Sequence, residues 1–163
     1  MLALALAVAI APWSHPLAFG KLAGWRTGAS GNVRSVYVGR GSGATLMSTA
    51  WIARGVTYRD AATADPPNVT LAHLSKKAVI VWAVITGPAS KEQPIRLSLA
   101  AAKHVPCCDA VGIVGGTDEL HGSARRGAYS VIVRIYYGSV PTTAMRAAAA
   151  KALARLELPP VRR

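Results

Sequence analysis

Four apolar stretches in the second half of the chain have the pattern of strands. Residues 78–85 are eight consecutive apolar residues rich in β-branched types, which predicts a buried central strand. Residues 95–99 alternate apolar and polar side chains, which predicts a half-buried strand. Residues 119–123 and 128–137 flank a glycine-containing turn at 125–127 and predict an antiparallel hairpin.

The first half of the chain carries weaker strand signals. Residues 33–38 and 46–53 mix apolar and small side chains as strands do, and residues 57–60 are expected to extend their pairing. The glycine-rich residues 39–43 predict a turn or loop between them. The Pro-Pro pair within 65–68 restricts the backbone and predicts a turn or extended connection.

The last element is predicted to be a helix. Ser139 or Thr142 can cap its start, Arg155 is expected in its last turn, and Pro159-Pro160 is expected to end it. The apolar residues recur at three- and four-residue steps: Met145, Ala148, Ala149, Ala152, Leu153 and Leu156.

These elements predict the α+β class, with a mainly antiparallel sheet and one long C-terminal helix packed on one face. The helix has a narrow, alanine-rich stripe, which we expect to lie across the sheet face formed by residues 95–99 and 131–137. At 163 residues the chain has the length of one domain.

Residues 1–11 are entirely apolar and resemble the central region of a secretory signal peptide. They are too short to span a membrane, and no cysteine occurs in the first 100 residues as an acceptor for a lipid anchor. We therefore interpret residues 1–20 as a signal-like segment with a linker and residues 21–163 as a single domain that is secreted or otherwise extracytoplasmic, with no integral membrane span. The alternative is that residues 1–11 form a buried core element.

The 19 Lys and Arg against seven Asp and Glu give a formal charge of +12, which favours an anionic partner. That partner is expected to be an anionic polymer, a lipid surface or an acidic envelope protein. If strand pairing brings them together, the contact candidates are Arg34, Arg40, Arg125 and Arg126, with Tyr37, Tyr136 and Tyr137 nearby. Nucleic acid is the alternative anionic partner, although no nucleic-acid-binding motif accompanies the charge. The 13 Arg against 6 Lys also match a high-GC coding bias, to which part of the charge is attributable.

His104, Cys107 and Cys108 form the one local cluster of reactive residue types. A disulfide between adjacent cysteines would be strained and easily reduced, which suggests redox activity. A thiolate with His104 as base and Asp109 or Asp118 as orienting group is a second alternative. A zinc site that adds His121 is disfavoured, because adjacent strand residues point to opposite faces and no C-x-x-C spacing occurs. A purely structural role for the cysteines is the simplest interpretation.

Other catalytic and cofactor motifs are incomplete. The glycines at 39–43 do not match a phosphate-binding loop, and residues 28–32 carry Asn where the G-x-S-x-G motif requires its last glycine. We therefore expect no cofactor and no metal, and we favour a non-enzymatic protein.

Several stretches resemble uncharacterised exported proteins of high-GC bacteria. They are residues 65–68, 79–82, 106–108 and 129–134, together with the closing helix. The resemblance covers roughly residues 24–160 and implies export and a shared fold, but no established activity and no catalytic residue. The function expected from the sequence is that of a small exported domain that contacts an anionic surface, with thiol chemistry and nucleic-acid binding as alternatives.

Overall fold

The computed structural model describes residues 13–37, 43–56, 74–87, 93–105 and 116–161. Its elements follow the chain in this order: β1 (Ala18–Phe19), β2 (Arg26–Tyr37), β3 (Gly43–Arg54), β4 (Val79–Thr86), η1 (Leu99–Ala101), β5 (Lys103–Val105), β6 (Thr117–Ala124), β7 (Tyr129–Tyr137), α2 (Thr143–Leu153) and β8 (Leu156–Glu157). The predicted strand extension at 57–60 and the turn at 65–68 lie outside the described residues.

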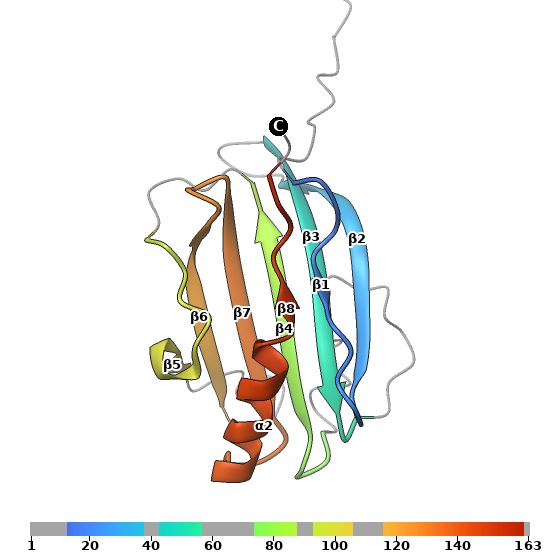
Figure 1. The fold of residues 1–163 in the computed structure, drawn as a ribbon, viewed down its shortest axis with the longest axis vertical. Helices are drawn as coiled ribbons and strands as arrows, with labels where there is room; N and C mark the ends of the chain where they lie inside the picture. Colours follow the sequence, from blue (N-terminus) through green and yellow to red (C-terminus); the bar gives the residue numbers. More distant parts are fainter. Residues whose placement is uncertain (1–12, 38–42, 57–73, 88–92, 106–115, 162–163) are drawn as a thin grey trace, which may run out of the picture.

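Six strands form one antiparallel sheet in the order β2-β3-β4-β7-β6-β5 (Figure 1). Two meanders, β2-β3-β4 and β5-β6-β7, meet where β4 pairs with β7. The apolar run predicted as a central strand is β4, which is buried over nearly its whole length. The predicted hairpin is β6 and β7, so the α+β class and the antiparallel sheet are confirmed.

One face of the sheet is covered by α2 and by the β1–β8 ribbon, which runs lengthwise in front of β3 and β4 (Figure 1). Thr142 caps α2 as predicted, because its Oγ1 accepts a hydrogen bond of 3.2 Å from the Met145 amide. The five buried helix residues all belong to the predicted stripe. The helix is shorter than expected, because the chain leaves it after Leu153 and Leu156 then pairs with Phe19 in the ribbon.

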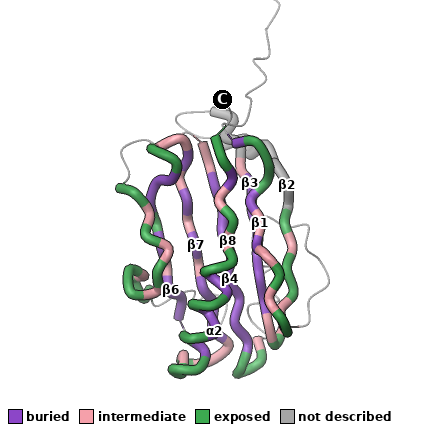
Figure 2. The backbone as a smooth tube through the Cα atoms, in the orientation of Figure 1, coloured by how far each residue is buried: buried purple, intermediate pink, exposed green. Residues whose placement is uncertain are grey.

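The core therefore lies mainly between the sheet and this covering layer, as the buried central strands in Figure 2 illustrate. A smaller apolar cluster around Trp51, Trp82 and Tyr136 occupies the opposite face. Within the described ranges, no helix combines the length and apolar character that a membrane span requires.

Residues 95–99 do not form a strand, so that prediction is wrong, although their side chains alternate between partly buried and exposed as predicted. Ile95 and Leu97 pack against the core while Arg96 between them is exposed, but this stretch has no strand pairing. Instead, the Ile95 amide bonds to the Ser123 carbonyl at 2.8 Å, and the chain then enters η1, capped by Ser98. Gly122 permits the approach, because a Cβ there would lie 2.7 Å from the Ile95 Cα.

The interpretation of residues 13–20 as linker is also wrong. Trp13 and Leu17 are completely buried and Phe19 nearly so, all within the main core. The Leu17 amide donates to the buried Ser48 Oγ at 2.8 Å, and the Trp13 ring meets Tyr129 edge-on with centroids 5.7 Å apart. The packed domain therefore begins at or before Trp13, while residues 1–12 lie outside the described part.

Candidate functional site

Of the predicted site residues, the structure describes the side chains of His104, Arg125 and Arg126. Cys107, Cys108 and Arg40 lie outside the described residues. Arg34 lies in β2, where it pairs with Leu46, and its side chain also falls outside the described part. His104 lies in the edge strand β5, and Arg125 and Arg126 form the turn between β6 and β7.

The Arg125–Arg126 turn has an unusual backbone. Arg125 and Arg126 have φ values of 53° and 58°, and Gly127 follows with 82°. A left-handed conformation costs a residue with a side chain roughly 1–2 kcal/mol, so Gly or Asn is the usual occupant. Two exposed arginines at such positions therefore mark the turn as a strained, cationic tip.

Strand register puts Arg34 and this tip at the same end of the sheet, on strands that are not neighbours. Val33 pairs with Met47, Met47 with Thr86, and Thr86 with Ser130, so three strand spacings of about 4.8 Å, roughly 14 Å, lie between β2 and β7 at this level. The expectation that Tyr136 and Tyr137 join this surface is wrong, because both are buried at the far end of β7.

A shallow groove of about 400 Å³ opens beside the tip. Its walls come from residues 94–97, the end of β6 and the segment that follows β8. Ile95, Leu97, Ala124 and Leu158 supply apolar surface, and Arg125 is the charged residue among its described lining. The Arg125 guanidinium donates through Nη2 to the Leu158 carbonyl at 2.8 Å, which holds it beside the groove.

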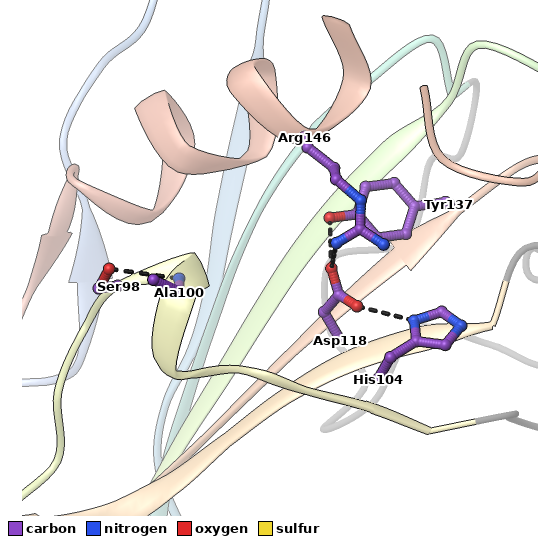
Figure 3. Close-up of polar contacts among 6 residues, drawn as sticks. All are labelled: Ser98, Ala100, His104, Asp118, Tyr137 and Arg146. Atoms are coloured by element: carbon purple, nitrogen blue, oxygen red, sulfur yellow. Dashed lines mark hydrogen bonds and ion pairs between the residues drawn. The ribbon is translucent and has the colours of Figure 1, made fainter. Parts of the chain in front are cut away.

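A second cluster centres on Asp118 in β6, which is almost fully buried beneath α2 (Figure 3). Its Oδ2 accepts hydrogen bonds of 2.9 Å from both the Tyr137 hydroxyl and Arg146 Nη1, and its Oδ1 lies 2.8 Å from His104 Nδ1. Burial, together with the bond to the Asp118 carboxylate, raises the pKa of Tyr137, so its hydroxyl remains a donor. One carboxylate thus links β5, β6, β7 and α2.

His104 has the orientation that a base requires. A carboxylate only accepts hydrogen bonds, so His104 Nδ1 carries the proton toward Asp118, and Nε2 is left as the acceptor of the neutral ring. Of the two predicted orienting groups, Asp118 makes the contact, while Asp109 lies outside the described residues. Gly116 allows this placement, because a Cβ there would lie 2.6 Å from His104 Nε2.

The zinc alternative is not supported by the register. His104 pairs with Asp118 and shares its face, whereas His121 shares the opposite face with Glu119. Within the described ranges, no group of three or more His, Cys, Asp or Glu side chains is arranged to hold a metal.

A third cluster forms on that opposite face. Glu119 Oε1 accepts a 2.6 Å bond from Arg134 Nε, and Oε2 lies 3.1 Å from His121 Nε2. The Arg134 guanidinium in turn lies 5.8 Å from the Trp82 ring centroid. Burial acts to raise the pKa of Glu119, but the bonds and charges of Arg134 and His121 outweigh it and lower the pKa below its usual value.

The Glu119 cluster predicts an acid-sensitive contribution to stability. Because the folded-state pKa of Glu119 is lowered, its stabilisation is present above the unfolded pKa of about 4.3 and is lost as the pH falls through the folded value. We expect Glu119→Gln to lose about 1 kcal/mol near neutral pH and progressively less toward pH 3. Denaturant unfolding from pH 6 to pH 3 measures this difference, and a pH-independent difference would contradict it.

The strained turn predicts a stabilising substitution. Arg126→Gly removes the steric cost at φ 58°, partly offset by the greater freedom of glycine in the unfolded chain, and we expect a net gain of about 0.5–1 kcal/mol. Thermal unfolding measures it, with Ala147→Gly in the exposed face of α2 as the control that is expected to lose stability. An equal loss in both variants would show that the turn is unstrained.

The sequence analysis missed Tyr137 and Arg146 as partners of Asp118, and it missed the Glu119 cluster. One local signal was available, since Asp118 and Glu119 are adjacent in a strand and therefore face opposite sides. Their partners come from other elements and only the register identifies them. Comparisons with protein-family models, with curated proteins and with solved structures gave no match, so the site rests on its own geometry.

Proposed function

We propose that this protein is a small, non-enzymatic domain that acts at or outside the cell envelope and binds an anionic lipid surface through the cationic tip Arg125–Arg126. The observation that carries the proposal is that acidic side chains are paired within the fold while the arginines of the tip are exposed. Asp118 is buried on Arg146 and Glu119 is paired with Arg134, whereas Arg125 and Arg126 are exposed on a protruding turn. Over the whole chain, 19 Lys and Arg stand against seven Asp and Glu, a formal charge of +12 that favours an anionic partner.

Vesicle sedimentation tests the electrostatic part. Binding to phosphatidylglycerol vesicles is expected at about 50 mM salt, weakening strongly by about 200 mM, with little binding to phosphatidylcholine. Each basic residue near an anionic surface contributes about 1 kcal/mol, so Arg125→Gln/Arg126→Gln is expected to weaken binding roughly thirtyfold. Lys76→Gln/Lys77→Gln removes the same charge before β4, at the opposite end of the sheet, and serves as the matched control.

No binding to anionic vesicles at low salt would overturn the proposal. Equal loss in the two double variants would mean that net charge, rather than the tip, drives binding. Tighter binding to a DNA duplex than to vesicles at the same salt concentration would favour the nucleic-acid alternative.

Export is proposed because residues 1–11 are entirely apolar, as the central region of a signal peptide is. A cut after Ala9 removes most of that segment and a cut after Ala11 removes all of it, and both leave Trp13 and its core contacts in the mature chain. Intact-mass measurement of the protein purified from its producing cells tests this, since loss of the segment is expected. A mature protein that retains residues 1–11 would contradict export.

The contact between His104 and Asp118 favours thiol chemistry at Cys107 or Cys108 as the second candidate function. An oriented imidazole three residues before Cys107 in the sequence is a suitable base for a thiol. If His104 activates a cysteine, His104→Asn is expected to slow alkylation by iodoacetamide at neutral pH, while His121→Asn leaves it unchanged. Equal alkylation rates in all three proteins would remove this candidate.

A further inference from the structure

The groove beside the cationic tip combines an apolar floor with one oriented cation. Its volume of about 400 Å³ lies at the lower end of the range for small-molecule sites, roughly 300–1,000 Å³. Ile95 and Leu97 reach it because Gly122 lets residues 93–95 approach β6 closely. The apolar side chains of the groove are therefore accessible to a ligand at this end of the sheet.

Arg125 is held at this groove by two constraints. Its backbone adopts a left-handed conformation with φ 53°, and its Nη2 donates to the Leu158 carbonyl at 2.8 Å. A guanidinium has five N–H donors, so the bond to Leu158 and the contact with the Tyr129 hydroxyl still leave donors for an anion. Strained backbone that persists in a folded protein is found disproportionately at ligand-binding positions.

We propose that this groove binds a single-chain anionic amphiphile, whose head group contacts Arg125 and whose chain lies along Ile95, Leu97 and Leu158. The inference rests on the proposed function and specifies the ligand chemistry at the same tip. A small hydrophilic anion would leave the apolar walls unused, and a neutral amphiphile would leave the guanidinium without a charged partner. The same chemistry is offered by a free fatty acid or alkyl phosphate and by one chain of an anionic phospholipid.

The structural role of Arg125 provides the main competing explanation. Its bond to Leu158 and the 2.6 Å bond from the Tyr129 hydroxyl to the Pro159 carbonyl together hold the segment after β8. Arg125→Lys keeps the charge and Arg125→Gln removes it, so the pair separates head-group attraction from anchoring of the segment. Lys76→Gln removes one positive charge before β4, at the opposite end of the sheet from the groove, and serves as the matched control.

Titration calorimetry with decyl phosphate below its micelle concentration tests the proposal on the full chain. Decyl phosphate is expected to bind at least tenfold more tightly than inorganic phosphate or decyl maltoside. Affinity is expected to rise up to fourfold per methylene from hexyl to decyl phosphate, until the groove is filled. Arg125→Gln is expected to weaken decyl phosphate binding tenfold or more, Arg125→Lys less, and Lys76→Gln less than twofold.

Equal losses of affinity in Arg125→Gln and Lys76→Gln, or an affinity that does not depend on chain length, would overturn the proposal. Leu97→Asp provides a second check, because it places a carboxylate in the partly exposed wall and is expected to abolish decyl phosphate binding while vesicle binding by the tip is retained. If phosphatidylglycerol vesicles bind but alkyl phosphates do not, the groove proposal fails and the proposed function stands. If neither binds, both fail. Release of vesicle-bound protein by decyl phosphate would identify a phospholipid chain as one occupant of the groove.

Discussion

A chain that begins at Lys21 is expected not to fold, whereas a chain that begins at Pro12 is expected to unfold cooperatively like the full chain. The shorter chain lacks Trp13, Leu17 and Phe19, which are all core residues. Truncating one such side chain costs about 2–5 kcal/mol, and the whole stability of a small domain is about 5–15 kcal/mol. Loss of all three, together with β1, therefore removes most or all of that stability. Circular dichroism and urea unfolding of the three chains measure the effect.

Point substitutions separate core packing from chain length in this experiment. Trp13→Ala in the full chain is expected to cost about 3–5 kcal/mol, because the indole is completely buried against Tyr129. His15→Ala, which alters an exposed neighbour, is expected to change stability by less than about 0.5 kcal/mol. A stable, cooperatively folded chain starting at Lys21 would contradict the assignment of residues 13–20 to the core.

The elements that were predicted correctly carry strong local signals. β4 is a long β-branched run, the β6–β7 hairpin is marked by its turn, and the α2 stripe repeats at helical spacing with Thr142 as its cap. In each case the residues that determine the structure lie within the element itself.

The errors arise where distant segments determine the structure. Residues 95–99 alternate apolar and polar side chains as a strand does. However, Gly122 lets residues 93–95 approach β6 closely, and only a few hydrogen bonds join them to it. Residues 13–20 show no clear period, and their place in the core depends on pairing with β8 and on Ser48. Neither partner can be identified from the local sequence.

In the candidate site too, the features set by the local sequence were predicted and those set by distant segments were missed. The sequence analysis identified Arg125 and Arg126 because they occupy a recognisable turn, and it named Asp109 or Asp118 as the partner of His104, of which Asp118 makes the contact. The left-handed backbone of the two arginines and the groove beside them depend on segments far apart in the sequence. The contacts of Tyr137 and Arg146 with Asp118 were missed because these residues come from β7 and α2, which the local sequence around Asp118 does not identify.

The two adjacent acids, Asp118 and Glu119, have different consequences for stability because strand geometry places them on opposite faces. Glu119 is partly exposed and holds a pair whose contribution is modest. Asp118 is buried and receives several donors at once, so its removal leaves more than one polar group without its partner. The larger effect is therefore expected at Asp118.

Asp118→Ala is expected to destabilise the protein by about 2–3 kcal/mol, because it leaves the buried Tyr137 hydroxyl without its acceptor and removes the charged partner of the half-exposed Arg146. Glu157→Ala, which removes an exposed acid, is expected to cost less than about 0.5 kcal/mol. Urea unfolding measures both, and hydrogen exchange is expected to show a selective loss of protection in β5, where His104 loses its contact.

A double-mutant cycle distinguishes this network from simple cavity formation. Once Asp118 is absent, the Tyr137 hydroxyl is already unpaired, so adding Tyr137→Phe to Asp118→Ala is expected to cost less than Tyr137→Phe alone, by about 1 kcal/mol or more. Strictly additive costs would contradict the network, since two groups that do not interact lose their stabilisation independently. A positive coupling together with unchanged binding of the tip to phosphatidylglycerol would place Asp118 in the scaffold that holds β5, β7 and α2 together, separate from the surface proposed to bind anions.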